Sequence, residues 1–74
     1  MKIQYDAEVD ALYIEFMPLP PGTAENRELN EDVIADYSPE GKLAGLEILN
    51  ASAVLGEKLQ KIVVEVSYPQ HSVA

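Results

Sequence analysis

Residues 33–49 have the sequence VIADYSPEGKLAGLEIL, in which two apolar runs flank a short polar segment. That segment is Ser38-Pro39-Glu40-Gly41, with proline and glycine at the second and fourth positions that a type I turn prefers. Two apolar runs joined by such a turn are typical of an antiparallel β-hairpin. The strands at 33–37 and 42–49 therefore predict a β-sheet as the basis of the fold.

The chain before this hairpin alternates between apolar and polar residues with the period of two that strands show. Ile3 and Tyr5 predict a short first strand. Residues 11–17 predict a second strand, because their β-branched and aromatic side chains suit a pleated sheet. Its faces are expected to carry Leu12, Ile14 and Phe16 on one side and Tyr13, Glu15 and Met17 on the other. The polar residues 23–29 occupy the place of an edge strand, where charged side chains discourage aggregation.

The chain changes character after Leu49. Asn50 is a suitable helix N-cap and Gly56 a suitable C′ residue, so a helix of about two turns is expected between them. Residues 59–66 are dense in β-branched side chains and predict a final strand. A single helix over residues 50–66 is the alternative, because a helical spacing also relates Val54, Leu55, Leu59, Ile62 and Val66.

These elements predict an α+β fold, an antiparallel β-meander of about five to six short strands with one short helix after the fifth strand. Residues 1–68 are expected to form a single small domain and residues 69–74 a frayed tail. A core in a chain of 74 residues supplies only about 3–5 kcal/mol of stability. Because the chain has no cysteine for disulfides, we expect a second subunit (a dimer) or a partner protein to add stability.

The chain is strongly acidic, with a net charge of −8. Cationic side chains supply most of the affinity for nucleic acid, so direct binding to nucleic acid is not expected, and anionic membranes are disfavoured for the same reason. A basic protein partner would be attracted. The sequence has neither an apolar N-terminal signal segment nor a run of about 20 apolar residues, so a cytoplasmic location is expected.

No group of residues predicts catalysis or a cofactor, and an enzyme is not expected. Asp6, Glu8 and Asp10 are spaced like the start of a calcium loop, but Ala11 and Met17 stand where that loop needs glycine and glutamate. We interpret the three acidic residues as turn formers. The single histidine, His71, falls in the expected tail, away from partners that a triad or zinc site requires.

Some side chains remain candidates for binding. Asp36 and Glu47 lie on the two strands of the central hairpin, where like charges are expected to point to solvent or to a cation. Together with Asp6 they are the candidates for a metal or small-molecule site. The candidates for a protein interface are Tyr13, Phe16, Tyr37 and Val64. For each tyrosine, a position between the core and the rim of its own domain is the alternative.

Several segments resemble the family known as domain of unknown function 2283. They are Lys2-Ile3-Gln4-Tyr5-Asp6, Ala11-Leu12-Tyr13-Ile14, Val33-Ile34-Ala35-Asp36-Tyr37, and Gly41 through Gly45-Leu46-Glu47-Ile48-Leu49 closing with Asn50-Ala51-Ser52. The resemblance spans about residues 1–52. It implies a small prokaryotic β-meander with a short helix and supplies no catalytic residues. The chain departs from the family in its proline-rich loop at 17–23 and in Ser38, where members commonly have an acidic residue.

The leading hypothesis is a protein-interaction module, either a homo-oligomer or the partner of a basic protein. The resemblance implies the second form, since some family members look like the small partner beside a toxin-like protein. The alternative is a domain that binds a metal or small molecule through surface carboxylates.

Overall fold

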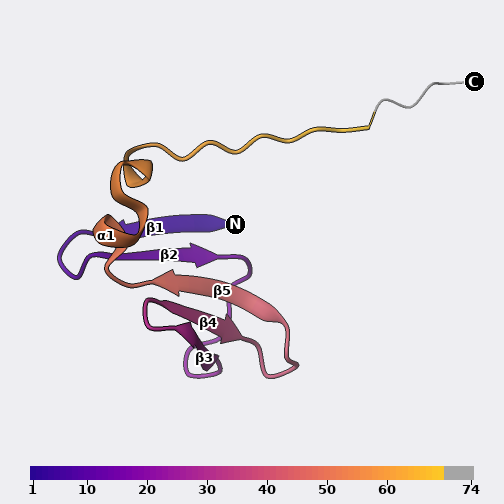
Figure 1. Ribbon diagram of the computed structural model, residues 1–74. Coiled ribbons are helices and arrows are strands. Elements are labelled where there is room, and N and C mark those ends of the chain that lie inside the picture. Colours follow the sequence, from indigo (N-terminus) through magenta and orange to yellow (C-terminus); the bar gives the residue numbers. More distant parts are fainter. Residues whose placement is uncertain (70–74) are drawn as a thin grey trace, which may run out of the picture.

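The computed structural model describes residues 1–69 and contains a single antiparallel sheet (Figure 1). Its strands are β1 (Lys2–Asp6), β2 (Ala11–Glu15), β3 (Glu25–Asn30), β4 (Val33–Tyr37) and β5 (Leu43–Ile48). The order across the sheet is β1-β2-β5-β4-β3. The hairpin β1–β2 is thus joined to the meander β3–β4–β5 by the pairing of β2 with β5. The predicted α+β meander is confirmed, with β1 and β3 as its edges.

The central hairpin forms as predicted. Residues 38–41 make the turn, in which the Gly41 amide donates to the Ser38 carbonyl at 2.8 Å. The buried Ser38 side chain adds a bond, because its hydroxyl accepts from the Lys42 amide at 3.1 Å. Gly41 has a φ of 86°, a backbone conformation that favours glycine. The turn places Tyr37 opposite Leu43, and an irregularity next to it shifts the register so that Val33 lies opposite Ile48.

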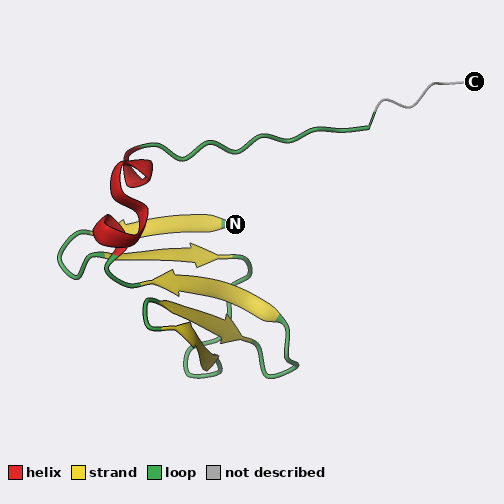
Figure 2. Cartoon of the chain, viewed as in Figure 1, coloured by secondary structure: helices red, strands yellow, loops and turns green. Residues whose placement is uncertain are grey.

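The helical part follows β5 and is short (Figure 2). An α-helix, α1 (Ala51–Leu55), is followed directly by a 3₁₀ helix, η1 (Gly56–Gln60). Gly56 has a φ of 57° and ends α1, which agrees with the prediction that this glycine terminates the helix. In the described part of the chain, no helix is long and apolar enough to cross a membrane.

The predicted final strand over residues 59–66 is wrong, and so is the alternative of one helix over 50–66. Leu59 lies in η1, and residues 61–69 are extended but pair with no strand of the described chain (Figure 1). β-Branched side chains favour an extended backbone, yet a strand also needs a neighbour to accept its hydrogen bonds. The predicted tail at 69–74 lies outside the described residues except for Pro69.

The register gives the sheet two unlike faces, because cross-strand partners share a face. One face, here called the apolar face, carries Ile3, Tyr5, Leu12, Ile14, Val33, Ala35, Leu46 and Ile48. The other, here called the acidic face, carries the carboxylates of Asp6, Glu15, Glu28, Asp36 and Glu47. The predicted separation of Leu12 and Ile14 from Tyr13 and Glu15 is confirmed.

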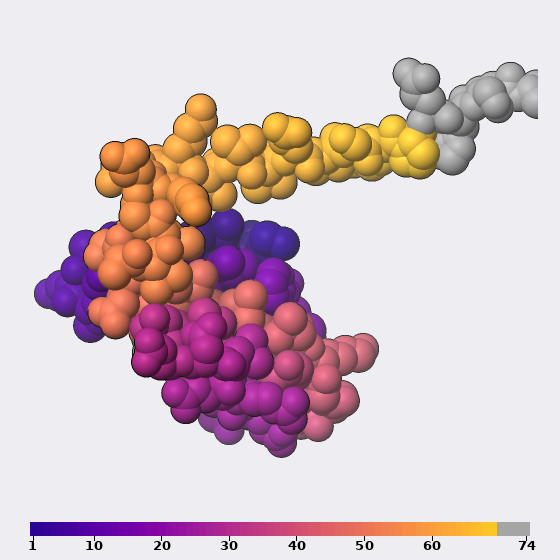
Figure 3. Space-filling view, in the orientation of Figure 1, coloured from indigo at the N-terminus to yellow at the C-terminus, as the bar shows by residue number. Residues whose placement is uncertain are grey.

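The buried core is small. Among residues 1–69, the buried apolar residues are Leu12, Ala35, Ala44 and Ala51, so Leu12 is the one large side chain among them. Figure 3 shows residues 51–60 gathered at one end of the molecule. Val54 of α1 lines the same hollow as Val33, which places the helix over one end of the apolar face. On the apolar face, Leu12 and Ala35 are buried, Ile14 and Leu46 are half-buried, and Tyr5 is exposed, so its cover within residues 1–69 is incomplete.

Candidate functional site

Asp10 joins the turn between β1 and β2 to the start of α1. Its carboxylate accepts the backbone N–H of Ser52 at 3.0 Å and the Ser52 hydroxyl at 2.6 Å. The Tyr5 hydroxyl donates to the same carboxylate at 2.7 Å. The Ala51 amide donates to the Asp10 carbonyl at 2.9 Å. One side chain therefore caps a helix that lies 42 residues further along the chain.

Asn50 is the N-cap residue of α1, as the sequence predicts, but the side chain that caps the helix is that of Asp10. Asn50 occupies the N-cap position with a φ of 50°, but its side chain makes no cap bond. Its amide nitrogen instead donates to Asp32 at 3.3 Å. Local sequence favours Asn50 as the cap, whereas Asp10 is brought to the helix only by the folding of the whole sheet. The sequence predicts Asp10 to be a turn residue, and its φ of 52° supports that role as well.

The hydrogen bonds at Asp10 shift two titrations in opposite directions. Donation from the Ser52 hydroxyl and then from Tyr5 lowers the pKa of the Asp10 carboxyl below its usual range. The hydrogen bond to Asp10 raises the pKa of Tyr5. Both shifts favour the state that makes the bonds, a charged Asp10 beside a neutral Tyr5.

We expect the Asp10→Asn variant to lose less stability in acid than the wild-type chain. A carboxyl whose pKa is lower in the folded state adds stability above its unfolded pKa, and that stability is lost as the pH falls through the folded pKa. The wild-type urea midpoint should therefore fall from pH 5 to pH 2 more steeply than that of Asp10→Asn. The exposed Glu40→Gln is the matched control and should keep the wild-type slope. Equal slopes for wild type and Asp10→Asn would contradict this role of the carboxylate.

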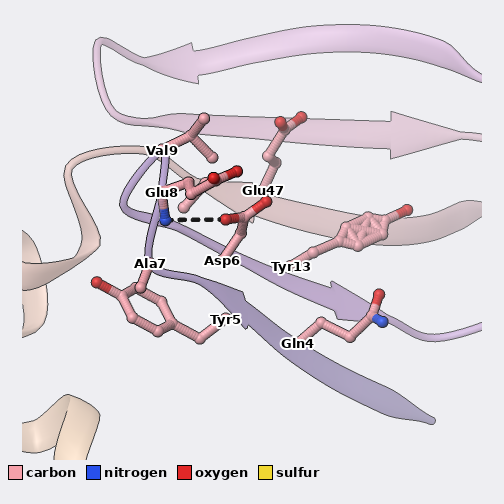
Figure 4. Close-up of a pocket in the computed structure, with 9 residues that line it drawn as sticks. Gln4, Tyr5, Asp6, Ala7, Glu8, Val9, Tyr13 and Glu47 are labelled. Atoms are coloured by element: carbon pink, nitrogen blue, oxygen red, sulfur yellow. Dashed lines mark hydrogen bonds between the residues drawn. The ribbon is translucent and has the colours of Figure 1, made fainter.

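An open hollow of about 690 Å³ lies beside the β1–β2 turn (Figure 4). It is lined by Gln4, Tyr5, Asp6, Ala7, Glu8, Val9, Ala11, Tyr13 and Glu47. Asp6 accepts the Glu8 amide at 3.0 Å, which confirms its role as a turn former. The pairing of β2 with β5 brings Glu47 to the same hollow, since Glu47 lies opposite Tyr13. Two of the candidate carboxylates, Asp6 and Glu47, thus line one site.

Asp36 lies on the same face but outside this hollow. It is only 8% exposed and lies opposite Gly45, over which the Tyr13 side chain packs. Burial and the nearby Asp36 carboxylate raise the pKa of Tyr13. The Oδ1 atom of Asp36 is buried and has no hydrogen-bond partner among the described residues. The Tyr13 side chain therefore packs against its own sheet beside Asp36 and does not project into solvent.

The structure does not assemble the three candidate carboxylates into a metal site. Across residues 1–69, no three side chains of His, Cys, Asp or Glu lie close enough together to hold an ion. Asp36 and Glu47 are diagonal neighbours, because Glu47 lies opposite Ile34 and Asp36 lies opposite Gly45. This offset keeps the two carboxylates from lying directly opposite each other. The expectation that Asp36 points to solvent is wrong, because the residue is buried.

The four candidate interface residues lie on different parts of the molecule. Tyr13 packs on the acidic face, and the guanidinium of Arg27 lies 5.2 Å from the centre of the Tyr37 ring. That distance is typical of a cation–π contact, so Tyr37 is engaged within its own chain. Phe16 is exposed where the chain leaves β2, and Val64 is 74% exposed beyond η1.

Comparison with known families identifies residues 2–52 with a family model described as a protein of unknown function (DUF2283). The matched segment includes all five strands and both ends of the Asp10–Ser52 connection. The chain belongs to this family. No curated protein and no solved structure matched the chain. The DUF2283 match ends inside α1, so η1 and the extended segment after it lie outside the matched region.

Proposed function

We propose that this DUF2283 protein is a protein-interaction module whose apolar face is covered by a second polypeptide. The observation that supports this proposal is the incomplete burial of that face. Ile14 and Leu46 lie opposite each other on the central strands β2 and β5, yet both are only half-buried. An apolar sheet face is stabilised when another layer packs on it. The helices α1 and η1 are five residues long each, which is too short to cover a five-stranded sheet.

The exposed apolar side chains extend beyond this face. Large apolar groups that remain exposed include Met1, Tyr5, Val9, Phe16, Leu29, Leu43 and Val54. Single exposed apolar residues are ordinary, but several large ones in so small a domain, beside an incompletely buried apolar face, favour an interaction site.

A second copy of the chain is the partner that the charge distribution favours. Asp6, Glu15 and Glu47 project from the acidic face, on the opposite side of the sheet from Ile14 and Leu46. Two copies can therefore join through their apolar faces while the carboxylates of both remain in water. The net charge of −8 then opposes association only at long range and maintains solubility.

The test compares two isoleucines that are both half-buried on inner strands but lie on opposite faces. Ile14→Thr alters the apolar face, and Ile34→Thr makes the same substitution on the acidic face. In sedimentation equilibrium, we expect the wild-type chain to exceed its 8.1 kDa monomer mass as concentration rises. Ile14→Thr should weaken the association by at least about tenfold, and Ile34→Thr should leave it near the wild-type value. A strictly monomeric wild-type chain would contradict self-association.

A basic protein is the second candidate partner, and it is favoured by the carboxylates gathered on the acidic face. Such a complex would use Asp6 and Glu47 at the hollow, and its affinity should fall steeply with salt. A lysine-rich peptide serves as the probe. Its affinity is measured at low and high salt for Glu47→Gln and for the matched control Glu57→Gln, which lies in η1. A defined site predicts a larger loss of affinity in Glu47→Gln, whereas general attraction to an acidic chain predicts equal losses.

A further inference from the structure

The segment after η1, residues 61–68, is here called the arm. In an extended conformation, one side of the arm carries Ile62, Val64, Val66 and Tyr68, and the other carries Lys61, Glu65, Ser67 and one apolar residue, Val63. Every residue of the arm is exposed, and Lys61 begins it with extended backbone angles of −148° and 120°. The arm leaves the sheet as an extended chain (Figure 1). It has the pattern and the length of a strand but lacks a neighbour within its own described chain.

Strand β1 is an edge that lacks a neighbour on one side. It pairs with β2 alone, so its outer N–H and C=O groups have no strand partner among the described residues. Ile3 and Tyr5 lie on its apolar side, and Lys2, Gln4 and Asp6 lie on its acidic side. Met1 continues the same alternation on the apolar side.

One antiparallel register matches the arm to β1 on both faces. If Val64 lies opposite Ile3, then Ile62 lies opposite Tyr5 and Val66 opposite Met1, so that apolar groups meet on the apolar face. The same register places Lys61 opposite Asp6 and Glu65 opposite Lys2. Both charged pairs are of opposite sign, and Val63 meets Gln4 between them. Cross-strand pairs of these kinds are the ones that stabilise antiparallel sheets.

The competing pairings lack this agreement. A parallel alignment that keeps the charged side chains together places Lys61 opposite Lys2 and Glu65 opposite Asp6, which opposes like charges. The other free edge, β3, presents Glu25 and Arg27 on the side that the apolar residues of the arm would need. The charged pairs and the match between apolar sides therefore both favour pairing of the arm with β1.

We propose that the arm adds to the β1 edge of a second copy of this chain, and that two copies exchange arms in a symmetric dimer. This inference rests on the proposed function, since it names the segment through which the module associates. Every residue of the arm is exposed in the single chain, so the arm is available to a second copy. In a two-fold exchange, the contact between an arm and a β1 strand occurs twice. The added strands also extend the apolar face with Ile62, Val64 and Val66, and so enlarge the surface that the two copies cover.

Two aspartate substitutions test the pairing without disturbing the monomer, because both sites are exposed there. Val64→Asp places a charge on the side that would meet Ile3, and Val63→Asp places the same charge on the side that would meet Gln4. Sedimentation equilibrium should show the dimer weakened at least about tenfold by Val64→Asp and little changed by Val63→Asp. Equal effects of the two would overturn the strand pairing, because general apolar adhesion has no such alternation.

A cysteine experiment identifies which copy provides the edge. The chain has no cysteine, so Ile3→Cys and Val64→Cys can be made in separate chains and mixed under mild oxidation. Side chains directly opposite in an antiparallel pair are within disulfide reach, so a covalent dimer carrying both substitutions is expected. Ile3→Cys mixed with Val63→Cys is the matched control and should cross-link much less. A single chain with both Ile3→Cys and Val64→Cys that closes on itself as a monomer would overturn the assignment to a second copy.

The outcomes separate this inference from the proposed function. A wild-type dimer that is unaffected by Val64→Asp but weakened by Ile14→Thr would overturn arm exchange and would still support the proposed interaction module. A wild-type chain that is monomeric at all concentrations would overturn both arm exchange and self-association through the apolar face. Weakening by Val64→Asp together with the mixed disulfide would support the exchange.

Discussion

Replacing Leu12 with alanine is expected to leave the chain largely unfolded at room temperature. Leu12 is 5% exposed and is the one large side chain in a core otherwise made of Ala35, Ala44 and Ala51. Removing a buried leucine costs about 2–5 kcal/mol, which is as large as the roughly 3–5 kcal/mol that a core in so short a chain supplies. Circular dichroism at low protein concentration should show loss of the cooperative thermal transition.

Leu29→Ala is the matched control for this experiment. Leu29 is 53% exposed and lies at the irregularity of β3 between Glu28 and Asn30. Its truncation should change the free energy of unfolding by no more than about 0.5 kcal/mol. If Leu12→Ala melts like Leu29→Ala, the stability of the fold does not depend on the side chain that the structure buries.

Substitution of Gly45 by alanine is expected to be the next most damaging change. A Cβ atom at this position would lie 2.6 Å from the Tyr13 hydroxyl oxygen and 2.9 Å from the Ile14 carbonyl oxygen. Both distances are too short for real contacts, so the ring and the neighbouring strand must move. Such overpacking costs about 1–3 kcal/mol, and each kcal/mol lowers the melting temperature of a small domain by roughly 4–8 °C.

A double variant distinguishes this clash from a general effect of losing glycine. In a Tyr13→Ala background, the Gly45→Ala substitution should cost measurably less, because the ring that it meets has been removed. Part of the cost should persist, since the Ile14 carbonyl remains in place. Strict additivity of the two substitutions would contradict the packing of Tyr13 over β5.

The parts of the fold that local sequence determines were predicted correctly. The turn at 38–41 selects its own backbone conformation, and the alternation along 11–15 assigns Leu12 and Tyr13 to opposite faces. The polar segment that ends at Asn30 forms the expected edge strand, because its charges tolerate full exposure. In each case the physical cause lies within a few neighbouring residues.

The features that sequence did not reveal depend on residues far apart in the chain. The cap on α1 comes from Asp10, and nothing near residue 50 indicates it. The hollow that joins Asp6 to Glu47 exists because β5 inserts between β2 and β4, an order that alternation alone does not specify. The density of β-branched residues in 59–66 correctly indicates a preference for extended backbone in the arm, but sequence pattern cannot supply the strand that would pair with it.

The bonds that Asp10 makes to Ser52 have a mechanical consequence. They join two positions 42 residues apart, and β2 to β5 lie between these positions, so the short helix cannot detach from the β1–β2 turn without breaking these bonds. A force applied to the residues after Gln60 passes along the backbone into β5, and the Asp10 bonds carry part of it to the β1–β2 turn. The segment from 51 to 60 is therefore held at two points, by its covalent link to β5 and by Asp10, and its release should require the loss of the Asp10 bonds.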